Sequence, residues 1–197
     1  MDDLKTYPID LKAAEALLDE AGYKRGADGI RFKLNLDYVP STEAYPRGAD
    51  YIRQALAKVG VDVTVRTQDF ATYTKRIYTD RDFDFAYEGM SNLFDPTVGV
   101  QRLYWSKNFK KGVPFSNGAA YSNPKVDALL EAAAVEIDPD KRVAQWKEIQ
   151  QILVDDVPAI DIVAAPEITI FNKRIADHTI GAEGVAGSLA FAHIAAS

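Results

Sequence analysis

The stretch RFKLNLDY at residues 31–38, with ADYIRQALAKVGVDVTV at residues 49–65, decides the fold. In the first part apolar and polar side chains alternate strictly, which predicts a strand with one face on a core. In the second part apolar residues recur at helical spacing up to Val59, Gly60 ends the helix, and a β-branched run follows. A strand, a helix and a strand within this length predict a βαβ unit with parallel strands and a right-handed crossover.

The flanking segments extend the same pattern in both directions. Before the first strand, Asp10 is placed to cap a helix from about Leu11 to Ala21, and Gly22 is placed to end it. After the second strand, Asp69 is placed to cap another helix, and residues 83–87 (FDFAY) predict a third strand. Three strands with intervening helices predict the α/β class, with an open, mainly parallel sheet and flanking helices.

The second half of the chain is more helical. Asn123-Pro124 and Asp138-Pro139 each combine a cap residue with proline in the first helical position, and each precedes apolar residues at helical spacing. We expect two antiparallel helices, the second stopped by Pro158. The apolar runs at residues 159–165 and 167–171 predict two short strands, and no firm element is predicted near the C-terminus.

Composition limits the functions that the chain can have. Its 197 residues, 47% hydrophobic and 26% charged, fit one globular domain or one lobe of a larger protein. A net charge of -6 argues against a nucleic-acid partner, because phosphate binding needs clustered Lys and Arg. The absence of cysteine excludes disulfides, thiolate zinc sites and a cysteine nucleophile. We expect this chain to carry no signal peptide and no membrane span.

Enzyme signatures are absent from the sequence. It lacks a G-x-S-x-G elbow, an H-E-x-x-H pair, a Walker loop, and a glycine-rich phosphate loop after the first strand. The two histidines, His178 and His193, have no second histidine or carboxylate at ligand spacing in a recognisable element. We therefore expect no catalytic residue, no metal ion and no cofactor.

The carboxyl ends of the strands give a better lead, because ligands of open α/β sheets bind there. The candidate loops are Pro40–Tyr45, Asp69–Tyr73 and Gly89–Pro96, which mix aromatic faces with neutral hydrogen-bonding groups. The alternative is that the aromatic side chains, including Tyr73, are core and that Asp69 and Asp95 cap helices. The predicted ligand-binding residues are Tyr45, Met90, Ser91, Asn92 and Phe94.

Several segments together resemble the C-terminal lobe of the family 5 extracellular solute-binding proteins, the peptide- and nickel-type receptors of ABC importers. The resemblance spans residues 7–175, in the same order and with similar spacing. It implies one lobe of a type II periplasmic binding protein fold. The matching segments are YPIDLKAAEALLDEAGY (7–23), IRQALAKVGVDVTVRTQDFATYTKRI (52–77), DFDFAYEGMSNLFDPT (82–97) and YSNPKVDALLEAAAVEIDPDKRVAQWKEIQQILVDDVPAIDI (121–162).

The resemblance implies a non-enzymatic receptor, periplasmic or extracellular and associated with the cell surface. Such a receptor captures a peptide-like or other small polar solute between two lobes and delivers it to an ABC permease in the membrane. Residues 1–161 would then form the ligand-binding C-terminal lobe. Residues 162–197 would pack on the N-terminal lobe of the same parent protein, so exposed apolar side chains there, or pairing with another copy, would be the sign.

The resemblance also bears on the loop EGMSNLFDP at residues 88–96. In the di- and oligopeptide receptors this loop carries a Gly-Trp pair and then an aspartate that pairs with the amino terminus of the peptide. Here Met90 replaces the tryptophan, Asn92 and Leu93 stand where the aspartate is expected, and Asp95 aligns with a later, capping aspartate. A buried ammonium group without a carboxylate partner costs several kcal/mol, so a ligand other than a simple free peptide is favoured.

Two other classes of protein stay open at this point. A small hydrolase-like or flavodoxin-like α/β enzyme would use the same strand-end loops. It would show a nucleophile and a base within hydrogen-bond reach, such as Ser91 beside His178 or His193, or a bound cofactor. An interaction domain would leave an uncovered apolar stripe on the helices between Asn123 and Val157.

Overall fold

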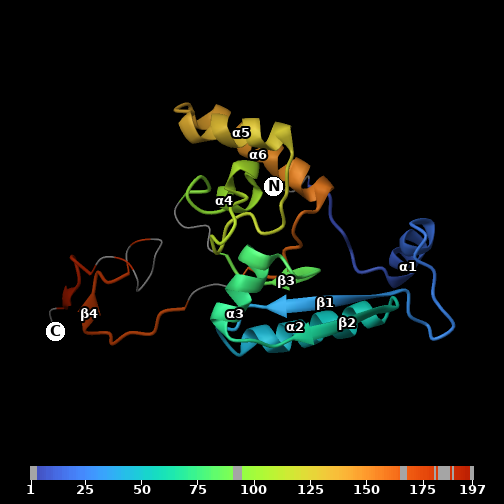
Figure 1. The fold of residues 1–197 in the computed structure, drawn as a ribbon. Coiled ribbons are helices and arrows are strands. Elements are labelled where there is room, and N and C mark those ends of the chain that lie inside the picture. Colours follow the sequence, from blue (N-terminus) through green and yellow to red (C-terminus); the bar gives the residue numbers. More distant parts are fainter. Residues whose placement is uncertain are drawn as a thin grey trace. The chain divides into compact units, whose positions relative to one another are not determined.

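The computed structural model describes residues 4–90, 95–164, 168–179, 181, 187 and 189–195 (Figure 1). The chain forms two compact units: residues 1–90 with 106–121, and residues 91–105 with 122–197. The expected division into a ligand-binding lobe (residues 1–161) and a segment that packs on the N-terminal lobe (residues 162–197) stays a prediction.

The first unit is built on a three-stranded parallel sheet. The central strand β1 (Phe32–Tyr38) lies between β2 (Val61–Arg66) and β3 (Phe85–Tyr87), in the order β2-β1-β3. Leu36 is aligned with Val65 on one side and with Phe85 on the other. The predicted open parallel sheet is therefore confirmed, and its carboxyl ends lie at one edge.

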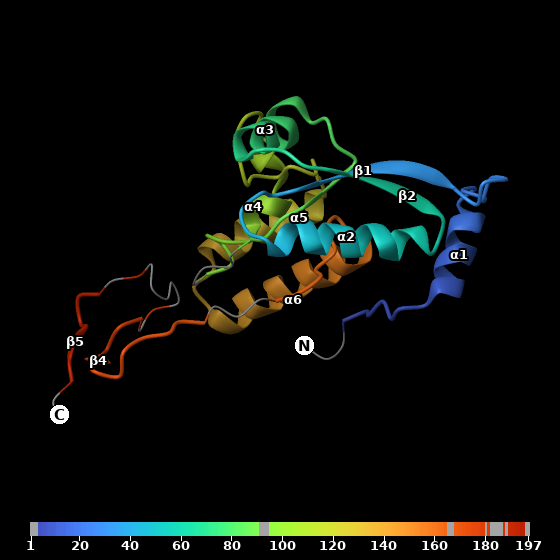
Figure 2. The same cartoon turned by 90° about the horizontal axis from the view of Figure 1, so that it is seen from below.

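Helices flank this sheet largely as predicted. The side chain of Asp10 accepts a hydrogen bond from the Ala13 amide at the start of α1, and Gly22, with φ of 89°, follows its end. The crossover helix α2 lies along β1 and β2 (Figure 2) and begins five residues earlier than predicted, with Pro46 in its first turn. The helices of this unit are α1 (Leu11–Glu20), α2 (Ala44–Ala57), α3 (Phe70–Lys75), the π-helical turn η1 (Arg76–Asp80) and the 3-10 turn η2 (Ser106–Asn108).

One face of the sheet is apolar. Leu36 and Tyr38 of β1 are buried with Val61 and Val63 of β2, and Ala49 of α2 packs against them. The burial of Leu36 and Tyr38 agrees with the alternation in β1, which predicts one face on a core.

The opposite face of β1 holds a buried charge. The carboxylate of Asp37 has no exposed surface, and it accepts hydrogen bonds from Arg66 (2.5 Å), Gln68 (2.9 Å) and Arg76 (3.2 Å). A buried carboxylate is stable only when it is paired in this way. The alternation in the sequence places Asp37 on the polar side, but it does not identify these partners.

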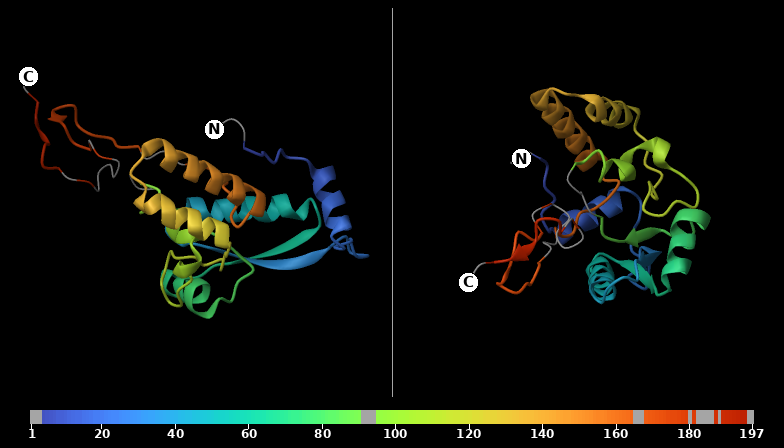
Figure 3. Two further views of the ribbon diagram at one scale, coloured as in Figure 1. Left: turned by 90° about the horizontal axis from the view of Figure 1, so that it is seen from above. Right: turned by 90° about the vertical axis from the view of Figure 1, so that its left-hand side faces the viewer.

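The second unit contains a helix pair. Asn123 and Asp138 cap α5 (Pro124–Val135) and α6 (Pro139–Asp156), as predicted, and each cap residue accepts hydrogen bonds from two amides of the first turn. The helices pack side by side, joined by residues 136–138 (Figure 3). A short helix, α4 (Gln101–Tyr104), packs on α5. The exposed apolar side chains of the pair include Val135 and Ile137 at its turn.

The two strands predicted after Pro158 do not form over the described residues 159–164 and 168–171. Their apolar side chains are exposed, as in Ile160 (78%) and Ile170 (94%). The sequence has strand character there, but a strand forms only where its backbone has a partner. Two short strands, β4 (Ile175–Ala176) and β5 (His193–Ile194), pair antiparallel, where no firm element was predicted. Within the described ranges, none of the helices has the length and apolar character to cross a membrane.

Candidate functional site

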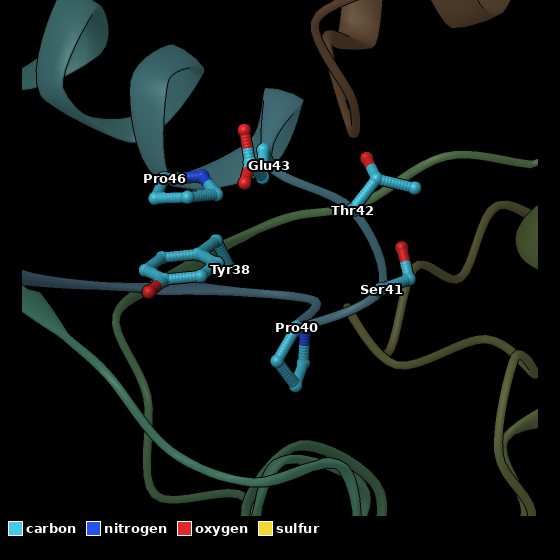
Figure 4. Close-up of a pocket in the computed structure, with 6 residues that line it drawn as sticks. All are labelled: Tyr38, Pro40, Ser41, Thr42, Glu43 and Pro46. Carbon is cyan, nitrogen blue, oxygen red and sulfur yellow. The ribbon is translucent and has the colours of Figure 1, made fainter.

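The loop after β1 lines an open pocket of about 380 Å³, within the size range of small-molecule sites. The rings of Tyr38 and Pro46 lie opposite each other in it, and the hydroxyl groups of Ser41 and Thr42 lie along the loop (Figure 4). This pocket therefore combines an aromatic wall with two hydroxyl groups and the carboxylate of Glu43. Its lining residues are Tyr38, Pro40, Ser41, Thr42, Glu43 and Pro46.

Tyr45 does not line this pocket, and its ring packs edge-on against Tyr87 at 5.3 Å between centroids. Gly48 makes room for Tyr87, because a Cβ atom at residue 48 would lie within 3.0 Å of the Tyr87 ring. A Cβ atom at Gly89 would likewise lie within 3.0 Å of the Tyr45 hydroxyl oxygen. Tyr45 therefore brings the start of α2 against the loop after β3, and its contact with a ligand stays a prediction.

Glu88 directly follows Tyr87, the last residue of β3, and two buried tyrosines hold its carboxylate. Glu88 accepts a hydrogen bond from the Tyr73 hydroxyl at 2.7 Å and from the Tyr78 hydroxyl at 2.8 Å. Neither tyrosine has exposed surface. Burial, and then the charge of Glu88, raise the pKa of Tyr73 far above its ordinary value, so this hydroxyl stays a neutral donor.

These contacts decide between the two interpretations of the loop after β2. Tyr73 belongs to the core, since it packs with Val39, Ile77 and Tyr78, and its hydroxyl group is used within the chain. Asp69 caps α3, as the alternative interpretation predicted, because its carboxylate accepts a hydrogen bond from the Thr72 amide at 2.9 Å. The hydrogen bonds from the Thr72 amide and hydroxyl lower the pKa of Asp69.

The loop after β3 is described only in part. Met90 is half-buried directly after Gly89, whereas the predicted ligand residues Ser91, Asn92 and Phe94 lie outside the described residues and stay predictions. Asp95 was expected to cap a helix starting at Pro96. Its carboxylate does accept from the Thr97 amide at 2.8 Å, but turns follow and α4 begins only at Gln101.

Asp95 also forms an ion pair that the sequence does not reveal. Arg142 of α6 donates to the Asp95 carboxylate and to the Thr97 hydroxyl, both at 2.8 Å. The hydrogen bond from Arg142, followed by that from the Thr97 amide, lowers the pKa of Asp95 far below its ordinary value. The same guanidinium donates to the Ala133 carbonyl at the end of α5. Arg142 therefore ties the turn after Asp95 to the helix pair.

The histidines lie apart from the strand-end loops in the sequence. His178 shares a hydrogen bond with Thr179, and His193 lies 3.6 Å from the Asp177 carboxylate. The described parts of the chain contain no group of three His, Cys, Asp or Glu residues that could hold a metal ion. Ser91, which a hydrolase-like enzyme would place beside a histidine, lies outside the described residues.

Comparison with known proteins decides the family. The model of the bacterial extracellular solute-binding proteins, family 5 Middle, matches residues 2–112. The chain belongs to this family. The match contains the whole three-stranded sheet and the strand-end loops that carry the predicted ligand residues, and it confirms the resemblance seen in the sequence.

Individual relatives agree with this assignment. Protein XP55 of Streptomyces lividans is 37% identical over 157 residues, which are 76% of this chain and 28% of that protein. The dipeptide-binding protein of Escherichia coli strain K12 is 26% identical over 183 residues, 91% of this chain and 33% of that protein. The chain thus spans about a third or less of these relatives.

Solved structures show the same fold. The periplasmic binding protein DppA of Helicobacter pylori, in complex with the peptide STSA, has a TM-score of 0.67 and 28% identity, covering 80% of this chain and 29% of that one. NikZ of Campylobacter jejuni, in complex with Ni(L-His), has a TM-score of 0.70 at 21% identity, covering 79% of this chain and 32% of that one. The fold is that of one lobe of a type II periplasmic binding protein. The family and these structural relatives are binding proteins rather than enzymes.

Proposed function

We propose that this chain is the C-terminal lobe of a solute-binding receptor of an ABC importer. The observation that carries the proposal is the family match over residues 2–112, because that range holds the parallel sheet and its carboxyl-end loops. Ligands of open α/β sheets bind at this edge. The receptor works by closure: one lobe holds the solute loosely, and closing adds the contacts of the second lobe and expels water.

The chemistry of the described loops favours a peptide-like or other small polar solute. Tyr38, Pro40 and Pro46 offer apolar contact, Ser41 and Thr42 offer neutral hydrogen-bonding groups, and Glu43 adds a carboxylate. The neutral residues Asn92 and Leu93 stand where peptide receptors carry the acid, so a ligand without a free amine at that position is favoured. Nickel as the solute has no support from the described residues, since no three His, Cys, Asp or Glu residues among them are grouped so that they could hold a metal ion.

The proposal includes two protein partners. The N-terminal lobe of the same parent protein would cover the segment from residue 162 to the C-terminus. The exposed side chains of Val163, Ile168 and Ile170 support this, since large exposed apolar side chains mark interaction surfaces. The second partner is the ABC permease, which places the receptor in the periplasm or at the cell exterior. No nucleic-acid partner and no enzymatic activity are part of the proposal.

Mass spectrometry of small molecules that co-purify with the full-length protein containing this chain tests the proposal. We expect one defined polar solute, retained by the wild type and largely lost from an Asn92→Ala variant. The matched control is Gln151→Ala, which removes an exposed amide on α6, outside the strand-end loops. If the wild type retains no solute, however quickly it is purified, the receptor function is wrong. If Asn92→Ala retains the same amount of solute as the wild type, the placement of the site is wrong.

A further inference from the structure

Three consecutive residues at the end of β3 are held from both sides of the sheet. On the apolar side, the Tyr87 ring packs on Tyr45, whose hydroxyl approaches Gly89. On the other side, the Glu88 carboxylate accepts hydrogen bonds from Tyr73 and Tyr78. The chain is therefore fixed at the point where it leaves the sheet and enters the loop with the predicted ligand residues.

The two donors to Glu88 are themselves held in place. Tyr73 lies on α3 and Tyr78 on η1, and both side chains are fully buried. The Tyr78 carbonyl accepts a hydrogen bond from the Gly112 amide at 2.7 Å, and its ring lies 5.9 Å from that of Phe115. The hydroxyl groups thus present a fixed pair of donors, to which the Glu88 side chain must conform.

The hydrogen bonds of Glu88 are of the strong kind. Hydroxyl donors at 2.7 and 2.8 Å to a carboxylate are charge-assisted, and such bonds are about twice as strong as neutral ones. They constrain both the side chain and the direction in which the backbone continues to Gly89 and Met90. A ligand-contacting group held by packing and supporting hydrogen bonds loses less conformational freedom on binding.

We infer that Glu88 is a positioning residue: clamped between Tyr73 and Tyr78, it fixes where the loop after β3 begins and thereby raises the affinity for the solute. This inference rests on the proposed function, because it assumes that the loop after β3 contacts the solute. A direct role in reading a positive charge on the solute is the competing role for the same carboxylate.

The chain offers a specific probe for the loop. It contains two methionines, Met1 and Met90, so ¹³C-methyl methionine labelling gives two signals, and the Met90 signal reports the start of the loop. We expect Tyr73→Phe, Tyr78→Phe and Glu88→Ala each to move the Met90 methyl signal. Glu88→Gln should leave it near the wild-type position, because an amide can accept from one hydroxyl and donate to the other. The matched control Glu15→Gln alters a carboxylate of α1 that pairs with Arg25.

The same variants in the full-length protein give the effect on binding. The ratio of co-purified solute to protein should fall about tenfold for the two Phe variants, the factor that 1.4 kcal/mol represents, and stay unchanged for Glu88→Gln and Glu15→Gln. An unmoved Met90 signal in both Phe variants would overturn the inference. The inference would also be overturned if Glu88→Gln lost the solute while both Phe variants kept it, because the Glu88 charge would then bind the solute directly. A wild type without solute contradicts the receptor function instead, while the Met90 signal still decides the positioning.

Discussion

The contact between Gly89 and Tyr45 predicts the stability of Gly89→Ala. A Cβ atom at residue 89 would lie within 3.0 Å of the Tyr45 hydroxyl oxygen, where ordinary van der Waals contact begins at 3.4 Å. Overpacking of this kind costs about 1–3 kcal/mol, and the reduced chain entropy of the unfolded state returns about 0.4–1 kcal/mol. We expect a net loss of about 1–2 kcal/mol in the free energy of unfolding.

Removing the oxygen should cancel this loss. The next Tyr45 atom, Cζ, would lie 3.6 Å from the added Cβ, which is an ordinary contact. In a Tyr45→Phe background, Gly89→Ala should therefore be neutral or stabilising by up to about 1 kcal/mol. The resulting coupling energy between the two sites is about 1–3 kcal/mol, within the range found for residues in contact.

Urea unfolding can assign this effect to the first unit. All tyrosines except Tyr104 lie in residues 1–90 and 106–121, whereas Trp105 and Trp146 both lie in the second unit. In Gly89→Ala, the unfolding transition followed by the tyrosine near-UV signal should shift to a lower urea concentration. The transition of the second unit, followed by tryptophan fluorescence, should stay unchanged. The control is Gly181→Ala, since a Cβ atom there meets nothing within 4 Å. Equal losses from Gly89→Ala with and without Tyr45→Phe would refute the reasoning.

Two further predictions concern charged groups. Arg66→Met leaves the buried carboxylate of Asp37 without its 2.5 Å ion pair, so we expect the free energy of unfolding, measured in urea, to fall by about 3 kcal/mol. The control Arg53→Met breaks an exposed ion pair and should cost less than about 1 kcal/mol. Similar losses in the two variants would contradict the role of burial. Because Arg142 lowers the pKa of Asp95 below its ordinary 3.8, the stability that Asp95 contributes is full above that pH and is lost as the pH falls towards the lowered pKa. In Asp95→Asn, the Tm of the second unit, measured by tryptophan fluorescence, should therefore fall less between about pH 5 and 2 than in the wild type. An equal fall in both proteins would contradict the ion pair.

Local sequence signals predicted the elements that depend on local physics. The alternation in β1 gave its buried face, and Asp10, Asn123 and Asp138 were recognised as caps because capping needs only the next few residues. The start of α2 was placed five residues late, because the prolines and Gly48 around it are typical of loops. The strands expected at residues 159–171 were wrong over the described residues, because pairing depends on a distant partner.

The chemistry of the strand-end edge was only partly predictable. The loops were found from the rule for open sheets, yet Tyr73 could be assigned to the core only once its burial was known. The Glu88 clamp joins residues 10 and 15 positions apart, and the pairing of Asp37 with Arg66 joins residues 29 apart. The Glu88 contacts arise from the packing of α3 and η1, and the Asp37–Arg66 contact arises from the alignment of β1 with β2. Neither has a local sequence pattern.

The most direct test of the central claim uses Met90 in the full-length protein. The solute recovered from the wild type is added back to solute-free, ¹³C-methyl methionine-labelled protein, and the Met90 methyl signal is followed. A receptor that binds its solute at the carboxyl ends of β1 and β3 predicts that this signal shifts and saturates with one equivalent. Binding detected by calorimetry with an unmoved Met90 signal would contradict the claim that this edge of the sheet holds the solute.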